Sequence, residues 1–143
     1  MDFIANTVDQ LNWWAIILAT LATLPVGFIW YDMKLGAGKR WAALNKLKVK
    51  DMNGRKGMGL TFTVMLITSF ATAFVLACIM RAMNVTGVWE SMLFGAVVGL
   101  ILRGGAHFIH NGFTQRPMEL TLIDAGHDIV SLAAMTTVLG LLR

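Results

Sequence analysis

The sequence predicts an all-α integral membrane protein, built as a single bundle of four transmembrane helices. Hydrophobic residues make up 57% of its 143 residues and charged residues only 14%, which leaves too little polar surface to cover a soluble core. The apolar residues also gather in four long runs, each able to cross about 30 Å of hydrocarbon as a helix. Within this one domain, the expected spans are residues 11–31, 58–80, 88–109 and 118–142.

The first expected span follows a short polar segment. That segment carries Asp2 and Asp9 but no Lys or Arg, so it lacks the basic start of a cleavable signal peptide and we expect it to be retained. Pro25 removes one backbone hydrogen bond inside the span and predicts a kink. Aromatic residues bracket the span, as they do at membrane interfaces: Trp13, Trp14, Trp30 and Tyr31.

A basic loop follows the first span. Residues 32–57 hold eight Lys or Arg residues against two Asp residues, and positive charge in short loops marks the cytoplasmic side. The loop should therefore be cytoplasmic and both termini external. Apolar residues at helical spacing within the loop predict a short helix at the headgroups: Trp41, Leu44 and Leu47. The candidate contacts to lipid headgroups are Lys39, Arg40, Trp41 and Lys46, although ordinary snorkelling lysines that only set the topology give the same pattern.

The other three spans are joined by short connections, so neighbouring helices should be antiparallel. Arg116 then falls on the cytoplasmic side, and Arg81 and Arg143 fall outside, in keeping with the basic loop. Small residues at four-residue spacing would let helices approach closely, either within the chain or between protomers. They are Ala15 and Ala19, Ser69 with Ala73 and Ala77, and Gly95 with Gly99.

The last two spans contain ionisable residues, which a lipid-facing helix should lack. On the third span they are Arg103, His107 and His110, and on the fourth they are Asp124, His127 and Asp128, followed by Ser131. Their spacing places them on one face of each helix. An antiparallel hairpin would bring Arg103 level with Gly126 and His110 level with Glu119, so the two polar faces should meet.

Three roles remain open for this polar cluster. It is a structural network that locks the hairpin and fixes subunit contacts, or a proton or ion site, or a ligand set for a metal or haem. As a structural network, its cheapest pairing puts Arg103 between Asp124 and Asp128, which leaves one acid in surplus. The metal ligands would be His107, His110 and His127 with an aspartate.

Other functional classes find little support in the sequence. It contains no Gly-rich phosphate loop, activated serine pattern or cysteine pair, so no catalytic residue is assigned and we do not expect an enzyme. The single Cys78 excludes an intrachain disulfide. The net charge of +4 comes mainly from the basic loop, so nucleic-acid binding is not expected. No cofactor is specified by any motif.

We therefore expect an accessory or interaction subunit, or a self-associating bundle, in a bacterial cytoplasmic (inner) membrane. Its partners would be membrane lipids and either further copies of itself or the other subunits of a membrane complex. The alternative is a proton-coupled or small-solute transporter, or an ion channel. Because one bundle of four helices leaves little room for a pathway, such a site would form between protomers.

Several short motifs resemble those of a family of small bacterial four-helix membrane proteins, domain of unknown function 1761. The resemblance covers most of the chain and involves Asn12-Trp13, Gly27, Trp30-Tyr31, Gly38-Lys39 and Trp41, then residues 122–127, 130–132 and Gly140. It implies a fold and a membrane location but no activity. Where the family pattern has an aromatic residue followed by His, this chain has Gly126-His127, followed by the additional Asp128.

If the family's recurring positions share a role, the resemblance implies seven candidates: Asn12, Trp30, Tyr31, Lys39, Trp41, Asp124 and His127. For the aromatic residues among them, interfacial anchoring is the simpler expectation. Asp32 could also approach the polar cluster, provided that the first helix packs against the hairpin.

Overall fold

The computed structural model describes residues 2–47 and 57–142, and it is helical throughout, with no strand in these ranges. Four helical stretches are long and apolar enough to cross a membrane. They are α2 (Trp13–Trp30), α4 (Met58–Ala82), the continuous stretch of α5 (Val88–Val98), η2 (Gly99–Gly104) and α6 (Gly105–Phe113), and α7 (Met118–Leu141). The short helices are α1 (Asp2–Asp9) and α3 (Gly38–Leu44). The all-α class and the four candidate spans are thus confirmed.

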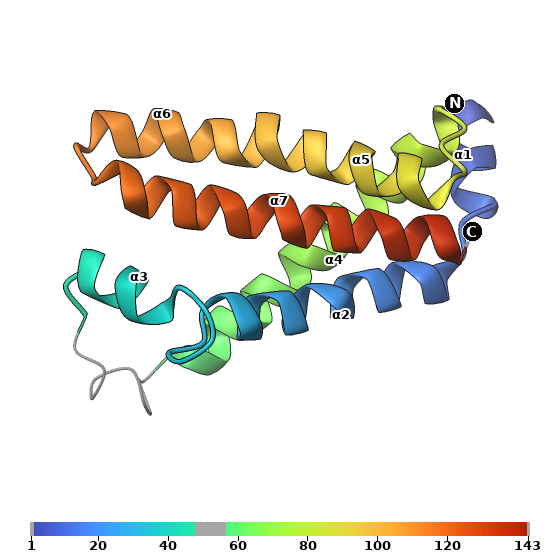
Figure 1. The fold of residues 1–143 in the computed structure, drawn as a ribbon. Coiled ribbons are helices and arrows are strands. Elements are labelled where there is room, and N and C mark those ends of the chain that lie inside the picture. Colours follow the sequence, from blue (N-terminus) through green and yellow to red (C-terminus); the bar gives the residue numbers. More distant parts are fainter. Residues whose placement is uncertain (1, 48–56, 143) are drawn as a thin grey trace.

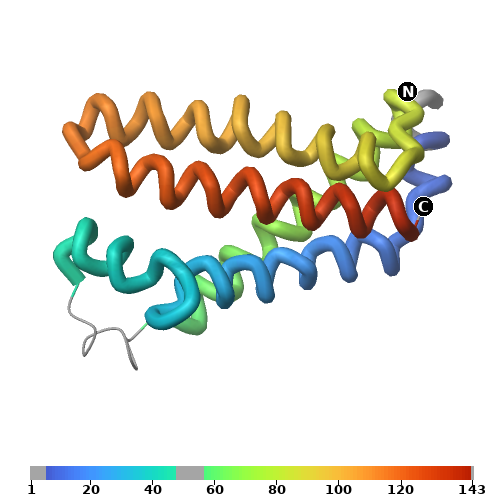
Figure 2. The backbone as a smooth tube through the Cα atoms, in the orientation of Figure 1, coloured from blue at the N-terminus to red at the C-terminus, as the bar shows by residue number. Residues whose placement is uncertain are grey.

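Helix α7 is the central element of the bundle. It packs against α5, η2 and α6 on one side and against α2 on another, while α4 packs mainly on α2 (Figure 1). The chain termini lie together at one end of the bundle. The α6–α7 turn and α3 lie at the opposite end, as the tube in Figure 2 shows. The third stretch ends at Phe113, four residues beyond the expected Ile109, because His110 to Gly112 continue the helix before the turn.

Small residues bring the third stretch and α7 into close contact. A methyl group in place of the Gly99 hydrogen would lie 2.8 Å from the Ile129 Cα atom, and one at Gly95 would collide with the Leu132 carbonyl and the Thr136 hydroxyl. At Gly104 the same methyl would lie 3.5 Å from the Ala125 side chain. This contact confirms the expected register, in which Arg103 is level with Gly126.

The predicted small-residue contacts also occur between α2 and α4. Ala15 and Ala19 of α2 and Ala73 and Ala77 of α4 are all buried in the hydrophobic core. Because alanine side chains are short, the two helices can approach closely and gain van der Waals contact. These close approaches lie within one chain.

Asn12 fixes the start of α2. Its side-chain oxygen accepts hydrogen bonds from the Trp14 and Ala15 amides, at 3.1 and 3.3 Å, and so caps the helix. Its Nδ2 donates to the Leu142 carbonyl at 2.6 Å, at the end of α7. One side chain therefore provides hydrogen-bond partners for backbone groups at two helix ends, where the helices themselves provide none.

The chain turns sharply between α2 and α3. The Asp32 carboxylate accepts the Lys34 and Leu35 amides at 2.7 Å each, and these bonds lower its pKa. Gly36 and Gly38 lie against the carbonyl groups at the end of α2, where any Cβ atom would collide with backbone. Glycine thus permits a turn tight enough for α3 to begin beside the end of α2. The short helix predicted in the basic loop is therefore present.

The third stretch is interrupted by η2, a six-residue π-helical segment. A π-helix bonds i to i+5, so it holds more residues per turn than the flanking α-helices, and such segments are frequent at functional sites. Both of its end residues, Gly99 and Gly104, are buried. Arg103 lies within it.

Candidate functional site

Asp128 is the centre of the polar cluster. Its residue is only 7% exposed, and three basic side chains surround its carboxylate. His107 Nε2 lies 3.1 Å from Oδ2 and His127 Nδ1 lies 3.1 Å from Oδ1, both in hydrogen-bonding geometry. Arg103 Nε forms an ion pair with Oδ2 at 3.1 Å. The Ser131 hydroxyl is 3.2 Å from the other ring nitrogen of His127.

This network lies near the middle of the helices that are long and apolar enough to cross a membrane. Asp128 is ten residues from Met118 and thirteen from Leu141 along α7, which corresponds to about 15 and 20 Å at 1.5 Å per residue. Arg103 is nevertheless 51% exposed at its side chain, and His107 is 36% exposed. One side of the network is therefore open at the surface of the single chain, near the middle of the candidate spans. A charge at that position would be costly in a membrane.

Two grooves meet at Arg103 on this open side. The first, of about 680 Å³, follows η2 and α6 and is lined by Leu102, Arg103, Ala106, His107, Ile109, His110, Phe113 and Asp128. The second, also of about 680 Å³, lies between α4 and α5 and is lined mainly by apolar side chains. Leu102 and Arg103 line both. The first groove is thus polar along one wall, whereas the second is hydrophobic.

Asp124 has a separate environment, formed by the α2–α3 segment. The Tyr31 hydroxyl and the Trp41 indole N–H donate to the same carboxylate oxygen of Asp124, at 3.1 and 2.9 Å. Burial, followed by the charge of Asp124, raises the pKa of Tyr31, so its hydroxyl keeps the proton that it donates. Trp30 donates its indole N–H to the Ile123 carbonyl at 3.1 Å.

The expected bridge from Arg103 to both aspartates is not formed. Arg103 pairs with Asp128 alone among the residues that the structure describes. Asp124 instead receives neutral donors, because Tyr31 and Trp41 approach it from the α2 side of α7. Asp124 is therefore the acid that no cation neutralises, and its carboxylate is held by hydrogen bonds from Tyr31 and Trp41.

Helix α3 is attached to the start of α7 by a second contact. Arg40 Nε and Nη2 donate to the two oxygens of Glu119 at 2.5 Å each, and this carboxylate raises the pKa of Arg40. Of the four candidate headgroup contacts, Arg40 and Trp41 are therefore engaged with α7. Lys39 and Lys46 are exposed, and the contact of all four with lipid stays a prediction.

The histidine candidates for a metal do not converge. His107 and His127 contact opposite oxygens of Asp128, while His110 lies farther along the first groove. Within residues 2–47 and 57–142, no three His, Cys, Asp or Glu side chains are grouped in a way that could hold a metal ion.

Residues 14–140 match the protein family described as "Protein of unknown function (DUF1761)". The chain belongs to the DUF1761 family. No curated protein and no solved structure matches it. In this DUF1761 chain, the positions that carried the resemblance are brought together around α7. Tyr31 packs against the rings of Trp41 and His127, with centroids 5.3 and 5.0 Å apart, and Trp30 meets His127 edge-on at 6.4 Å.

Sequence reasoning missed the hydrogen-bonding role of these aromatic residues. They were expected to be interfacial anchors, and their polar edges were given no partner. The signal was available, because a Tyr hydroxyl or Trp N–H close to a membrane interface needs an acceptor when it is buried. Asp124, the first residue of the polar face on α7, is that acceptor for Tyr31 and Trp41.

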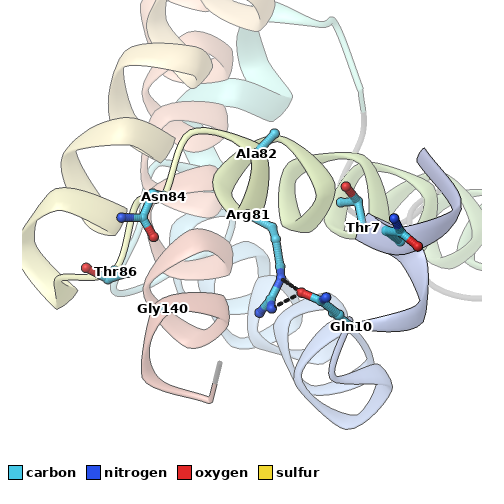
Figure 3. A pocket seen from close by; sticks show the side chains of 8 residues that line it. Thr7, Gln10, Arg81, Ala82, Asn84, Thr86 and Gly140 are labelled. Atoms are coloured by element: carbon cyan, nitrogen blue, oxygen red, sulfur yellow. Dashed lines mark hydrogen bonds between the residues drawn. The ribbon is translucent and has the colours of Figure 1, made fainter. Parts of the chain in front are cut away.

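A further pocket, of about 750 Å³, lies at the end of the bundle where the chain termini meet, away from the α6–α7 turn. Figure 3 shows Arg81 reaching across it to Gln10, with two guanidinium nitrogens donating to one amide oxygen. No pattern in the sequence indicated this pocket. Arg81 lies in the last turn of α4, where a cation favourably meets the negative end of the helix dipole. The contact thus joins the segment directly after α1 to α4. The pocket is lined by Asn6, Thr7, Gln10, Arg81, Ala82, Asn84, Thr86 and Gly140.

Proposed function

We propose that this DUF1761 protein is a self-associating interaction protein of the bacterial cytoplasmic membrane. The observation that carries the proposal is the half-exposed Arg103 side chain at the mid-depth of the bundle. A charged side chain at the bilayer centre costs about 2.5–3.5 kcal/mol on insertion scales, so it should not face lipid. A second copy packed over the grooves beside Arg103 would remove it from lipid.

The exposed half of α4 supports the same proposal. From Met58 to Thr68, only Met65 is partly covered in the single chain. This surface is adjacent to the hydrophobic groove, which Thr68 and Thr72 help to line. Small hydroxyl residues on such a surface favour close helix contacts in membranes.

In the proposed orientation, the basic loop is cytoplasmic and both termini are external. The α6–α7 turn with Arg116 lies at the same end as α3, so the positive charges of both connections would face the cytoplasm. Lys39 and Lys46 are free to contact anionic headgroups there.

Native mass spectrometry of the protein, released from its own membranes in mild detergent, tests the proposal. We expect a complex of two or more copies. Filling the groove by Ala106→Trp should reduce that complex, whereas Leu93→Trp, at an exposed position outside both grooves, should not. A single copy at every concentration would contradict self-association. A different protein retained in fixed ratio would instead support an accessory subunit.

Transport is a second candidate, favoured by one observation. Asp128 is held between two histidines near mid-depth, and its carboxylate borders the first groove. Such a group could accept a proton from one side of a membrane. Proteoliposomes loaded with a pH-sensitive dye should then equilibrate faster than empty vesicles, and Asp128→Asn should abolish the difference while the bundle stays folded. Equal rates for protein-containing and empty vesicles would exclude this candidate.

A further inference from the structure

The first groove connects the middle of the bundle with one of its ends. It begins beside Asp128 and Arg103 and reaches Phe113, the last residue of α6. The ten residues from Arg103 to Phe113 cover about 15 Å at 1.5 Å per residue. This is roughly half of the hydrocarbon thickness. The groove therefore runs from mid-depth to the end where the α6–α7 turn lies.

Polar groups that lack a protein partner follow this groove. The ion pair with Asp128 is the only polar contact of the Arg103 guanidinium within residues 2–47 and 57–142. The ring of His110 has no hydrogen-bond partner there, and Nδ1 of His107 has none either. Unsatisfied polar groups cost several kcal/mol each in hydrocarbon. Water in the groove would satisfy all of them.

The spacing of these groups suits water-mediated contact. Arg103, His107 and His110 follow one another along one helix face, and neighbours at such spacing have Cβ atoms about 5–6 Å apart in an α-helix. One water molecule can bridge polar groups at this separation. Histidine can also take up and release a proton near neutral pH. A proton from the surface could therefore reach the Asp128 carboxylate through His110 and His107.

Beyond Arg103 the surroundings become hydrophobic. The second groove continues from Leu102 and Arg103 between α4 and α5, where it is lined by Val75, Leu76, Ile79, Phe94, Val98 and Leu132, with Thr68 and Thr72 at its edge. A groove lined in this way offers water few hydrogen-bond partners, so water in it is unfavourable. Water entering along the first groove would therefore stop at the Arg103–Asp128 pair.

We infer that the first groove is an aqueous half-channel, open only at the α6–α7 end, which connects Asp128 with the solution on the side of the basic loop. The inference rests on the transport candidate and specifies the side from which protons would enter, which is the side of the basic loop. The charged and titratable groups facing Asp128 are Arg103 from η2, His107 from α6 and His127 from α7 itself. Tyr31, directly after α2, is also close enough for the charge of Asp128 to act on it. Because Arg103 should not face lipid, the second copy of the proposed function would form the outer wall of the half-channel, with water and protons between the two.

Cysteine accessibility tests the half-channel on the full chain. Cys78 is the only cysteine, so Cys78→Ala gives a background for single cysteines in oriented proteoliposomes. Ala106→Cys places a thiol in the first groove, Val98→Cys places one in the hydrophobic groove, and Ile101→Cys places one at an exposed position outside both. The probe is a permanently charged, membrane-impermeant methanethiosulfonate.

We expect Ala106→Cys to react at least about tenfold faster than the other two variants, because only the thiolate reacts and each unit by which a dry environment raises the pKa of a thiol removes a factor of ten. The reaction should occur with reagent added on the basic-loop side. Equal rates for Ala106→Cys and Ile101→Cys, or reaction from the other side only, would overturn the half-channel.

These rates are measured without any flux, so the two ideas can fail separately. If Ala106→Cys reacts as expected but the proteoliposomes show no proton flux, the half-channel stands and transport fails. If Ala106→Cys does not react, the half-channel is overturned, whatever the flux assay shows.

Discussion

Gly99→Ala should destabilise the bundle, although the same substitution at Gly105 of the same helical stretch should stabilise it. The new methyl group would lie 2.8 Å from the Ile129 Cα atom and 3.1 Å from the Asp128 carbonyl oxygen. Because both atoms belong to the backbone of α7, the two helices would have to separate. Overpacking of this kind costs about 1–3 kcal/mol, against a gain of about 1 kcal/mol from replacing glycine in a helix. The net loss should be up to about 2 kcal/mol.

Gly105→Ala is the matched control. A Cβ atom there meets nothing within 4 Å, so only the gain of about 1 kcal/mol should remain. The free energies of unfolding of the two variants should therefore differ by the full overpacking cost of about 1–3 kcal/mol. Unfolding in mixed micelles by added dodecyl sulfate, followed by circular dichroism, measures both. Equal unfolding midpoints for Gly99→Ala and Gly105→Ala would refute the close packing described for the third stretch and α7.

Three further changes test individual contacts. Trp41→Phe keeps a ring but removes the N–H donor to Asp124, and loss of a hydrogen bond to a charged group should cost about 1.5–3 kcal/mol; the α3 amides should exchange faster with deuterium. Asn12→Ala removes the cap of α2 at a cost of about 1 kcal/mol and frees the Leu142 carbonyl, which should lower the thermal midpoint. Because its amide bonds lower the pKa of Asp32, the stability that they give the α2–α3 turn is fully present above the ordinary value of 3.8. It should be lost as the pH falls through the lower pKa of the folded state, as amide chemical shifts would show.

Each of these predictions has its own control. Trp89→Phe alters a 77% exposed tryptophan and should leave α3 exchange unchanged; the same exchange in Trp41→Phe as in the wild type would argue against the Asp124 contact. Asn12→Asp retains a capping oxygen and should recover the α2 cap without the bond to α7. In Asp32→Asn the acid transition of the turn should disappear. If the transition persists there, a different group causes it.

Much of the fold could be predicted because the length of the hydrophobic runs is a long-range pattern. The four spans appear within a few residues of their expected bounds, and the contact of Gly104 with Ala125 confirms the register of the hairpin. That register follows from an antiparallel connection of four residues between Phe113 and Met118, which leaves little freedom. With the hairpin in this register, Arg103 lies within reach of Asp128.

The surroundings of Asp124 could not be predicted, because they depend on the geometry of one turn. Tyr31 and Trp41 reach Asp124 only because the turn between α2 and α3 is tight enough at Gly36 and Gly38 to return the chain beside α2. Hydropathy carries no information about such a turn. The π-helical segment could not be predicted either. It adds only one residue to the spacing of apolar side chains along the third stretch, and the hydropathy of that stretch is the same with or without it.

That segment absorbs one residue within the helix that carries half of the polar cluster. A π-helical turn holds about one residue more than an α-helical turn, so the helix on either side of it keeps its rotational phase. Deleting Leu100, which is exposed, should therefore let residues 88–113 form an uninterrupted α-helix in which Gly95 and His107 both still face α7. Deleting one residue between Gly105 and His107, outside the segment, would instead rotate the helix beyond the deletion by about 100°. Chains related to this one by a one-residue gap within the π-helical segment would therefore share both its packing and its cluster.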